Sequence, residues 1–294
     1  MEEKPNYGKA IGGAALVGGV FGVVGMGLVA AYSFTPLYGQ GVSIFFVLGT
    51  LGLIGAILFL CGVYPKLEAI GGMGAVLPIC GFVSAVAGAT FGASKATGSA
   101  GKGALVAVVE LLCKVVLVAI ALCCVVATIM HFTNLGTVFT APYAPGGISV
   151  DQVGAPWGSA DGPPMGVPVS LDPLSFVWAF VVAALVTATA QAVLMLTKLP
   201  VPIYLVILLT LGAILTPFGI MKALAVLGGG GFQVLIVDAG EAITSTFYAL
   251  LQGNFMPFVY VLLLFGFLFV VGILTGWIKL AMAKGKDASE KDAA

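Results

Sequence analysis

The sequence predicts an all-α polytopic integral membrane protein made of two inverted repeats, each with three transmembrane helices and one glycine-broken re-entrant element. Three observations lead to this prediction. The 294 residues are 60% hydrophobic and 8% charged, with a mean hydropathy of +1.16, whereas a soluble domain carries about 25% charged residues. Apolar runs long enough to cross a bilayer recur along the chain, and the two halves of the chain match each other.

The apolar runs define the expected helices. Because a helix needs about 20 apolar residues to cross the hydrocarbon core, spanning helices are expected at 10–32, 43–63, 104–130, 173–196, 201–218 and 256–278. Two further apolar stretches, 68–94 and 225–252, are interrupted by glycine and polar residues. The chain is therefore divided into a first membrane repeat at 1–131, a second at 173–279 and a charged tail at 280–294.

The two halves match at a shift of 157 residues. This shift places GAIL at 55–58 on GAIL at 212–215, and the glycines at 71, 72 and 74 on those at 228, 229 and 231. Ile79 and Ala85 fall on Ile236 and Ala242 without a gap. One register with clustered glycines indicates an internal duplication. Each half is then expected to hold two helices, one interrupted element and a further helix.

The lysines indicate how the halves are oriented, because cytoplasmic loops of membrane proteins carry an excess of positive charge. If every element spanned the membrane, the glycine- and proline-rich segment 132–172, which has no lysine, would lie inside. If 68–94 instead enters and leaves by the cytoplasmic face, only Lys222 lies outside. Ten lysines are then cytoplasmic: Lys4, Lys9, Lys66, Lys95, Lys102, Lys198, Lys279, Lys284, Lys286 and Lys291.

This second arrangement puts both termini in the cytoplasm and makes 132–172 an extracytoplasmic loop. Each half then has three membrane-spanning helices. Because three is an odd number, the second half is expected to start on the opposite side of the membrane and to have the inverted topology of the first. Inverted repeats with broken elements at matching positions are a sequence pointer to a transport site.

The glycine clusters GGMG at 71–74 and GGGG at 228–231 are expected at the breaks of the re-entrant elements. Glycine permits tight turns, and the half-helix after each break would present N–H groups to an anion. In this interpretation the path of a solute is lined by Gly71, Gly72, Gly74, Gly228, Gly229 and Gly231. In the alternative interpretation, the glycines only let helices pack closely.

Asp238 and Glu241 lie three residues apart, on one helical face about two turns beyond the second glycine cluster. An acid inside a membrane usually faces a bundle interior or an aqueous cavity and marks an ion or proton path. The pair could bind a proton, Na⁺ or Ca²⁺, with the hydroxyl of Thr244 as a further ligand. Alternatively the acids are solvated near the external face, and the hydroxyl bonds back to its own helix.

Glu110 and Lys114 form an i, i+4 pair inside the apolar run 104–130, with the acid in the favoured first position. Opposite charges at this spacing can neutralise each other in lipid. The pair is either a neutralised strut of the helix bundle or part of a pore lining.

Composition excludes several classes of protein. All twelve basic residues are lysine, which argues against a nucleic-acid partner and against an arginine clamp for a carboxylate. No hydrolytic triad or metal-ligand spacing is present, so we expect neither an enzyme nor a cofactor, apart from a bound cation such as Na⁺ or Ca²⁺.

Residues 62–94, GVYPKLEAIGGMGAVLPICGFVSAVAGATFGAS, resemble the signature of the stage V sporulation protein A (SpoVA) membrane subunits, of the AC and AE types. The positions that follow the family pattern are Gly62, Tyr64, Gly72, Gly74, Pro78, Ile79, Phe82 and Ser84. Glu110 resembles an acid of the AE type. Cys80 stands where threonine is usual and Ser84 where asparagine is usual, and the second half matches only through its repeat to the first.

The resemblance implies a function. SpoVA proteins move dipicolinic acid, as its calcium chelate, across the inner spore membrane during sporulation and germination, together with a soluble subunit. For this double-length chain it implies a channel or transporter in the bacterial inner (cytoplasmic) membrane for a small carboxylate or its cation complex. SpoVA-like membrane or soluble subunits are implied partners, and a homo-oligomer is compatible with the sequence.

The solute would pass between the two broken elements, near Pro78 and Ser84 on one side and Asp238 and Glu241 on the other. Two alternatives stay open. The protein is an ion-coupled (Na⁺ or H⁺) secondary carrier of small organic anions, or it is a non-transporting membrane scaffold for soluble partners.

Overall fold

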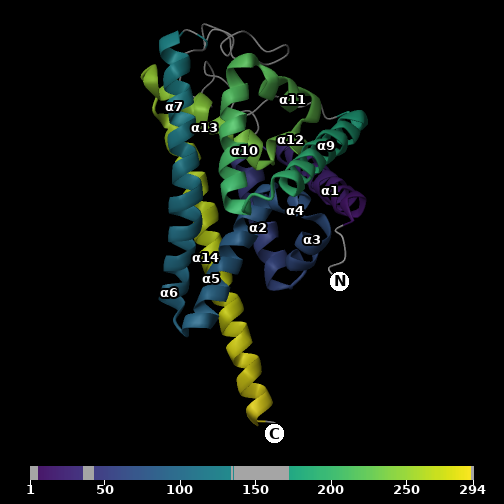
Figure 1. Cartoon of the computed structure of the whole chain (residues 1–294), viewed down its shortest axis with the longest axis vertical. Coiled ribbons are helices and arrows are strands. Elements are labelled where there is room, and N and C mark those ends of the chain that lie inside the picture. The colour runs from purple at the N-terminus through teal and green to yellow at the C-terminus, as the bar shows by residue number, and fades with distance from the viewer. Residues whose placement is uncertain (1–5, 36–42, 134, 136–171, 293–294) are drawn as a thin grey trace.

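The computed structural model describes residues 6–35, 43–133, 135 and 172–292, so the expected loop lies almost wholly outside the described residues. Within these residues every named element is a helix (Figure 1). The first half contains α1 (Tyr7–Ser33), α2 (Ser43–Leu60), α3 (Tyr64–Gly71), α4 (Met73–Val76), α5 (Ile79–Thr97), α6 (Ala100–Ala107), the π-helix η2 (Val108–Leu117) and α7 (Val118–Thr133). The second half contains α9 (Pro173–Thr197), α10 (Val201–Leu215), the 3₁₀ turn η4 (Thr216–Phe218), α11 (Ile220–Gly228), α12 (Gly230–Gln233), α13 (Ile236–Leu251) and α14 (Met256–Asp292).

Several helix ends follow from the local sequence. The Asn6 side chain accepts a hydrogen bond from the Lys9 N–H at 3.1 Å and so caps α1. Ser99 caps α6 in the same way, directly after Gly98 turns the chain in the left-handed region at φ 68°. The short α5–α6 turn therefore follows from Gly98 and Ser99.

Six helices of the described chain are long and apolar enough to cross a membrane: Tyr7–Tyr32, Ile79–Thr97, Ala100–Thr133, Pro173–Thr197, Val201–Phe218 and Met256–Gly285. The prediction of an all-α polytopic membrane protein is confirmed at this level. The structure differs at 43–63, because α2 passes the length test only together with α3, from which it is bent by 100°. Gly62 at φ 72° and Pro65 in the first turn of α3 explain this bend.

Each stretch that the sequence marks as interrupted is divided into three helices. In the first half α3, α4 and α5 replace a single element at 68–94, and α5 by itself has the length of a span. In the second half α11, α12 and α13 divide 225–252 at matching positions. The breaks themselves are therefore where the glycine clusters predict them.

The helices of the two halves interleave (Figure 1). α1 packs along α9, and α5 packs against α2 and also against α14 from the other half. Likewise α13 packs against α10 and against α7. The final helix of each half therefore covers the broken element of the other half. α3 and the C-terminal end of α14 lie toward one end of the molecule, and α11 lies toward the opposite end.

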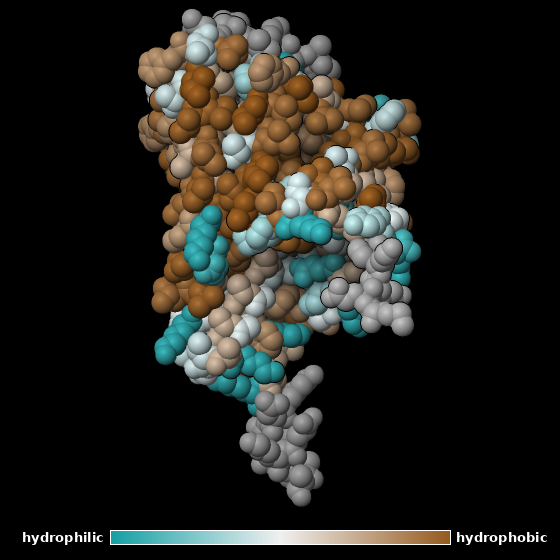
Figure 2. All heavy atoms as spheres, in the orientation of Figure 1, coloured by the Kyte–Doolittle hydropathy of each residue, from teal (hydrophilic) through white to brown (hydrophobic). Residues whose placement is uncertain are grey.

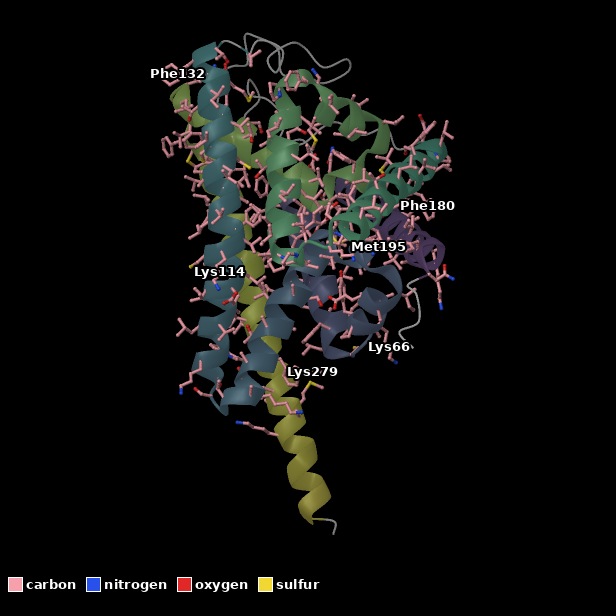
Figure 3. All side chains as sticks on the ribbon, in the orientation of Figure 1. Lys66, Lys114, Phe132, Phe180, Met195 and Lys279 are labelled. Carbon is pink, nitrogen blue, oxygen red and sulfur yellow. The ribbon has the colours of Figure 1, made fainter. Side chains whose placement is uncertain are left out.

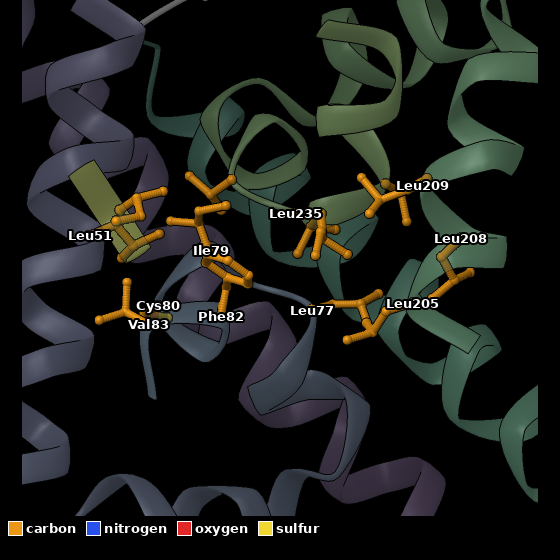
Figure 4. Packing of buried hydrophobic residues seen from close by; sticks show 14 of the residues in the cluster. Leu51, Leu77, Ile79, Cys80, Phe82, Val83, Leu205, Leu208, Leu209 and Leu235 are labelled. Carbon is orange, nitrogen blue, oxygen red and sulfur yellow. The ribbon is translucent and has the colours of Figure 1, made fainter. Parts of the chain in front are cut away.

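Apolar side chains fill the centre and also cover the outside. Figure 4 shows Leu77 and Leu235, from the two broken elements, close to the leucines of α10, and Ile79 near Leu51 of α2. On the outer face in Figure 2, hydrophobic residues cover the upper part and hydrophilic ones gather toward the lower end. Exposed residues such as Leu185 and Leu263, 63% and 62% accessible, suit contact with lipid rather than water.

Candidate functional site

The two broken elements meet at Pro78 and Leu235, which face each other in an isolated antiparallel bridge. Two backbone hydrogen bonds hold this junction, from the Ile79 N–H to the Val234 carbonyl at 3.0 Å and from the Ile236 N–H to the Leu77 carbonyl at 2.8 Å. At the shift of 157 residues, position 78 falls on 235, 79 on 236 and 77 on 234. The shift therefore exchanges the two hydrogen bonds, and each half supplies the same backbone groups.

A glycine makes the break that precedes each side of the junction. Gly72 has φ 46° and ψ −122°, and Gly229 has φ 50° and ψ −137°. Residues with a Cβ rarely adopt this conformation. The identical placement of two such turns explains why both clusters need glycine.

The backbone at the first break already has a partner. The Met73 N–H donates to Oε1 of Gln191 on α9 at 2.8 Å. The expectation that the half-helix after this break presents its N–H groups to an anion is therefore wrong for Met73, because a protein amide takes that place. Sequence reasoning did not single out Gln191, although an amide within the apolar run 173–196 is a signal for such a role.

The other glycines of the clusters lie in close helix contacts. A Cβ added at Gly71 would lie 2.7 Å from Cβ of Val17 on α1, and one added at Gly228 would lie 2.8 Å from Cγ1 of Val182 on α9. Additions at Gly74 and Gly231 would overlap the backbone of these same two helices. These contacts agree with the interpretation in which the glycines allow close packing.

A polar cluster lies behind the break in the first half. Ser84 on α5 donates from Oγ to Oε1 of Glu68 on α3 at 3.0 Å. Nearby, the buried Tyr64 hydroxyl lies 2.7 Å from the Ala75 carbonyl, to which it donates, and 3.2 Å from Sγ of Cys80. Ser84 is buried and Glu68 is half-buried, so a carboxylate stands beside hydroxyl groups within the helix bundle.

Glu68 was missed by sequence reasoning. It is an acid within the interrupted apolar stretch 68–94, just as Asp238 and Glu241 are acids within the interrupted stretch 225–252 of the second half. Applying this criterion to both halves would have found it.

The acids of the second half lie on α13, directly after the junction. Asp238 falls in the first turn of this helix, where the helix dipole favours a negative charge. Asp238 and Glu241 are both half-buried and interact electrostatically with each other. Lys222 on α11 interacts electrostatically with Glu241. Thr244 is fully buried and donates to the Gly240 carbonyl of its own helix at 2.8 Å.

The two clusters occupy matching places. The shift of 157 residues puts Ser84 on Glu241, and in each half a polar residue of the helix after the break interacts with a charged residue of the helix before it. The pair is Ser84 with Glu68 in one half and Glu241 with Lys222 in the other. In Figure 1, α3 and α5 lie toward the lower end of the molecule and α11 and α13 toward the upper end, so the helices that carry the two clusters lie toward opposite ends.

Glu110 and Lys114 do not belong to either cluster. Their side chains form a salt bridge of 2.6 Å on η2, with 53% and 60% of their surface exposed. The pair lies on the outside of the described structure, as the position of Lys114 in Figure 3 illustrates. This exposed position favours the interpretation of a neutralised pair on the surface that faces lipid or another subunit, rather than a pore lining within one chain.

Within the described residues, no group of three or more His, Cys, Asp and Glu side chains is arranged to hold a metal ion. A cation at Asp238 and Glu241 would need further oxygen ligands from elsewhere, since Ca²⁺ takes six to eight. Comparisons with protein-family models, with curated proteins and with solved structures found no match to this chain.

Proposed function

We propose that this protein transports a cation, or a small carboxylate in complex with a cation, across the bacterial inner membrane. The observation that carries the proposal is the reciprocal junction at Pro78 and Leu235, with a carboxylate cluster behind it on each side. Broken helices that meet within a bundle, with ionisable residues next to them, are the arrangement that transporters use for solute sites.

The proposal includes an inverted arrangement of the two halves. An antiparallel bridge between equivalent residues requires a local two-fold relation, because its hydrogen bonds exchange under the shift. The contact of α1 with α9 supports the same relation, since Gly18 lies against Thr187 and Gly22 lies against Ala183. α1 and α9 correspond at a different shift, of 165 residues. At that shift position 18 falls on 183 and position 22 on 187, so these two contacts also exchange between the halves.

The charges of the two clusters favour a cationic solute. The first holds Glu68 and the second holds Asp238, Glu241 and Lys222. Counted with formal charges, each cluster has a net charge of −1. This negative charge would repel a free carboxylate. A calcium chelate avoids this repulsion, because the metal offsets the charge of its ligand. Calcium dipicolinate is the first substrate to test, since residues 62–94 resemble the SpoVA signature.

A second candidate function is ion-coupled transport, in which Asp238 and Glu241 bind Na⁺ or a proton while an organic anion moves. The electrostatic interaction of Lys222 with Glu241 favours this candidate, because with formal charges the ammonium group leaves a single net negative charge on the cluster for one monovalent ion. SpoVA-like membrane or soluble subunits are the partners that the resemblance suggests.

The lysine distribution favours a cytoplasmic location for both termini. In Figure 3, Lys66 and Lys279 lie toward the same end of the molecule. Lys279 donates to the Leu60 carbonyl at 2.5 Å, close to the bend between α2 and α3. Lysines from both halves thus gather at one end, which fits the positive-inside rule.

Flux measurements with the purified chain in liposomes test the proposal. The panel should contain Ca²⁺ alone, free dipicolinate, calcium dipicolinate, Na⁺ and a small dicarboxylate. We expect uptake of the cation or its complex above that of empty liposomes. Uptake of the free anion only with a Na⁺ or proton gradient would favour the coupled carrier. No flux of any solute would contradict the proposal and favour a scaffold.

A further inference from the structure

The junction between the broken elements is an apolar barrier. The side chains that form it are all buried, with at most 4% of their surface accessible: Leu77, Ile79, Val234, Leu235 and Ile236. Pro78 is also buried. Figure 4 shows Leu77 and Leu235 packed close to one another and to Leu205 of α10. A hydrated ion cannot pass between such side chains without displacing them.

The polar groups at the junction are backbone groups that satisfy one another. The N–H groups of Ile79 and Ile236 donate to carbonyls across the bridge. Pro78 suits its position, because in this type of pair the bridged residues themselves make no hydrogen bond across the junction. The junction is therefore closed by apolar side chains, and the backbone groups that cross it are paired with each other.

The polar clusters lie on either side of this barrier. Glu68 and Ser84 belong to α3 and α5, and Glu241 and Lys222 belong to α13 and α11. In Figure 1, α4 and α12 lie between α3 and α11. The proposed path from one cluster to the other therefore crosses the junction.

We propose that the bridge between Pro78 and Leu235 is the closed gate of the transport path, and that solute crosses only when the two broken elements separate. This inference rests on the proposed transport function. Separation breaks both hydrogen bonds together, because each is made by residues next to the same bridged pair. The two elements therefore part as a unit, and the exposed N–H and carbonyl groups then line a wet path.

A disulfide across the bridge tests the gate. Residues in a non-hydrogen-bonded antiparallel pair have Cα atoms about 4.5 Å apart, which lies within the range of about 4.4–6.8 Å that disulfides span. Pro78→Cys and Leu235→Cys should be combined in a chain whose five native cysteines are replaced. After oxidation, we expect flux to fall to the level of empty liposomes, and reductant to restore it. Each single variant is compared with itself, and oxidation should not lower its flux below the value that the same variant has in reductant.

A second variant serves if the cysteine pair does not fold. Leu235→Ala shortens a barrier side chain without changing the backbone groups. We expect it to raise the leak of the transported ion when no oxidant is present.

The outcomes separate the gate from the proposed function. Full flux through a completely cross-linked chain, or no increase in leak for Leu235→Ala, would overturn the gate and leave transport standing. Absence of flux from the unmodified chain would overturn the proposed function, and the gate with it.

Discussion

Ser84 on α5 and Glu68 on α3 are joined by a hydrogen bond of 3.0 Å that ties together the helices on either side of the first break. The matching position in the second half is Glu241, which interacts with Lys222 on α11. Each half thus places a polar pair across the same two helices, with different chemistry. A hydroxyl donates to a carboxylate in one half, and opposite charges interact electrostatically in the other.

Replacing Ser84 by alanine should destabilise the fold. The hydroxyl is buried and its acceptor is a carboxylate, and a hydrogen bond to a charged group contributes about 1.5–3 kcal/mol. We expect a lower midpoint of thermal unfolding in detergent. Ser175→Ala is the matched control, because its hydroxyl donates to the Asp172 carbonyl at an exposed helix end. Equal unfolding midpoints for the two variants would show that the Ser84 bond adds no stability.

Alanine at Gly72 or Gly229 should also destabilise the protein, because each glycine has a positive φ that a Cβ makes unfavourable. Backbone strain of this kind costs about 1–3 kcal/mol per residue. A Cβ at Gly72 would in addition overlap Oε1 of Gln191.

Gly12→Ala provides the control for these two variants. Gly12 lies within α1 and has no atom within 4 Å of an added Cβ. Alanine there should be neutral or stabilising by about 0.5–1 kcal/mol, because glycine is unfavourable inside a helix. The thermal unfolding midpoints of the three variants test this prediction. An unchanged midpoint for Gly229→Ala would contradict backbone strain at the second break.

The sequence predicted the helices and the breaks because both depend on local signals. A long apolar run indicates a helix, and a glycine cluster indicates where that helix stops. The shift of 157 residues follows from identical residues at corresponding positions of the two halves. It correctly put Gly72 and Gly229, and the short helices α4 and α12, at matching positions.

The junction was not predictable in this way. Pro78 and Leu235 are far apart in the chain, and neither carries a feature that names the other as its partner. The contact of Gln191 with the Met73 N–H is equally non-local, since it joins α9 to the first break. The bend after α2 was also missed, because the apolar run 43–63 by itself has the length expected of a span, although α2 ends at Leu60. Such contacts follow from the packing of whole helices, which composition and periodicity do not specify.

The proposed topology predicts which turns face the cytoplasm. Single cysteines at Lys102 and Lys284, both exposed, should react with an impermeant maleimide from the cytoplasmic side only. A cysteine at the exposed Gln252, in the turn between α13 and α14, should react from the opposite side only. Labelling of intact and permeabilised cells makes the comparison, in a background without native cysteines. Labelling of Gln252→Cys and Lys284→Cys from the same side would refute the arrangement.

The acids on α13 should be more important for transport than the charged pair on η2. Asp238 and Glu241 are half-buried next to the junction, whereas Glu110 and Lys114 neutralise each other on the outer surface. We expect Asp238→Asn with Glu241→Gln to reduce flux strongly and to weaken its dependence on cation concentration. Glu110→Gln with Lys114→Gln should leave flux and cation dependence close to those of the unmodified chain.

This comparison isolates charge from packing. Asn and Gln are nearly the same size as Asp and Glu, so the variants remove negative charge and leave the helix contacts in place. An acid at the centre of a membrane helix is unfavourable by about 2.5–3.5 kcal/mol on insertion scales, so removal of the charge should not impair folding, and an unchanged elution profile in detergent checks this. A folded Asp238→Asn, Glu241→Gln protein with unmodified flux would exclude a cation site on α13. The charges there would then serve only the electrostatic interaction with Lys222, and the solute path would have to be sought on the Glu68 side of the junction.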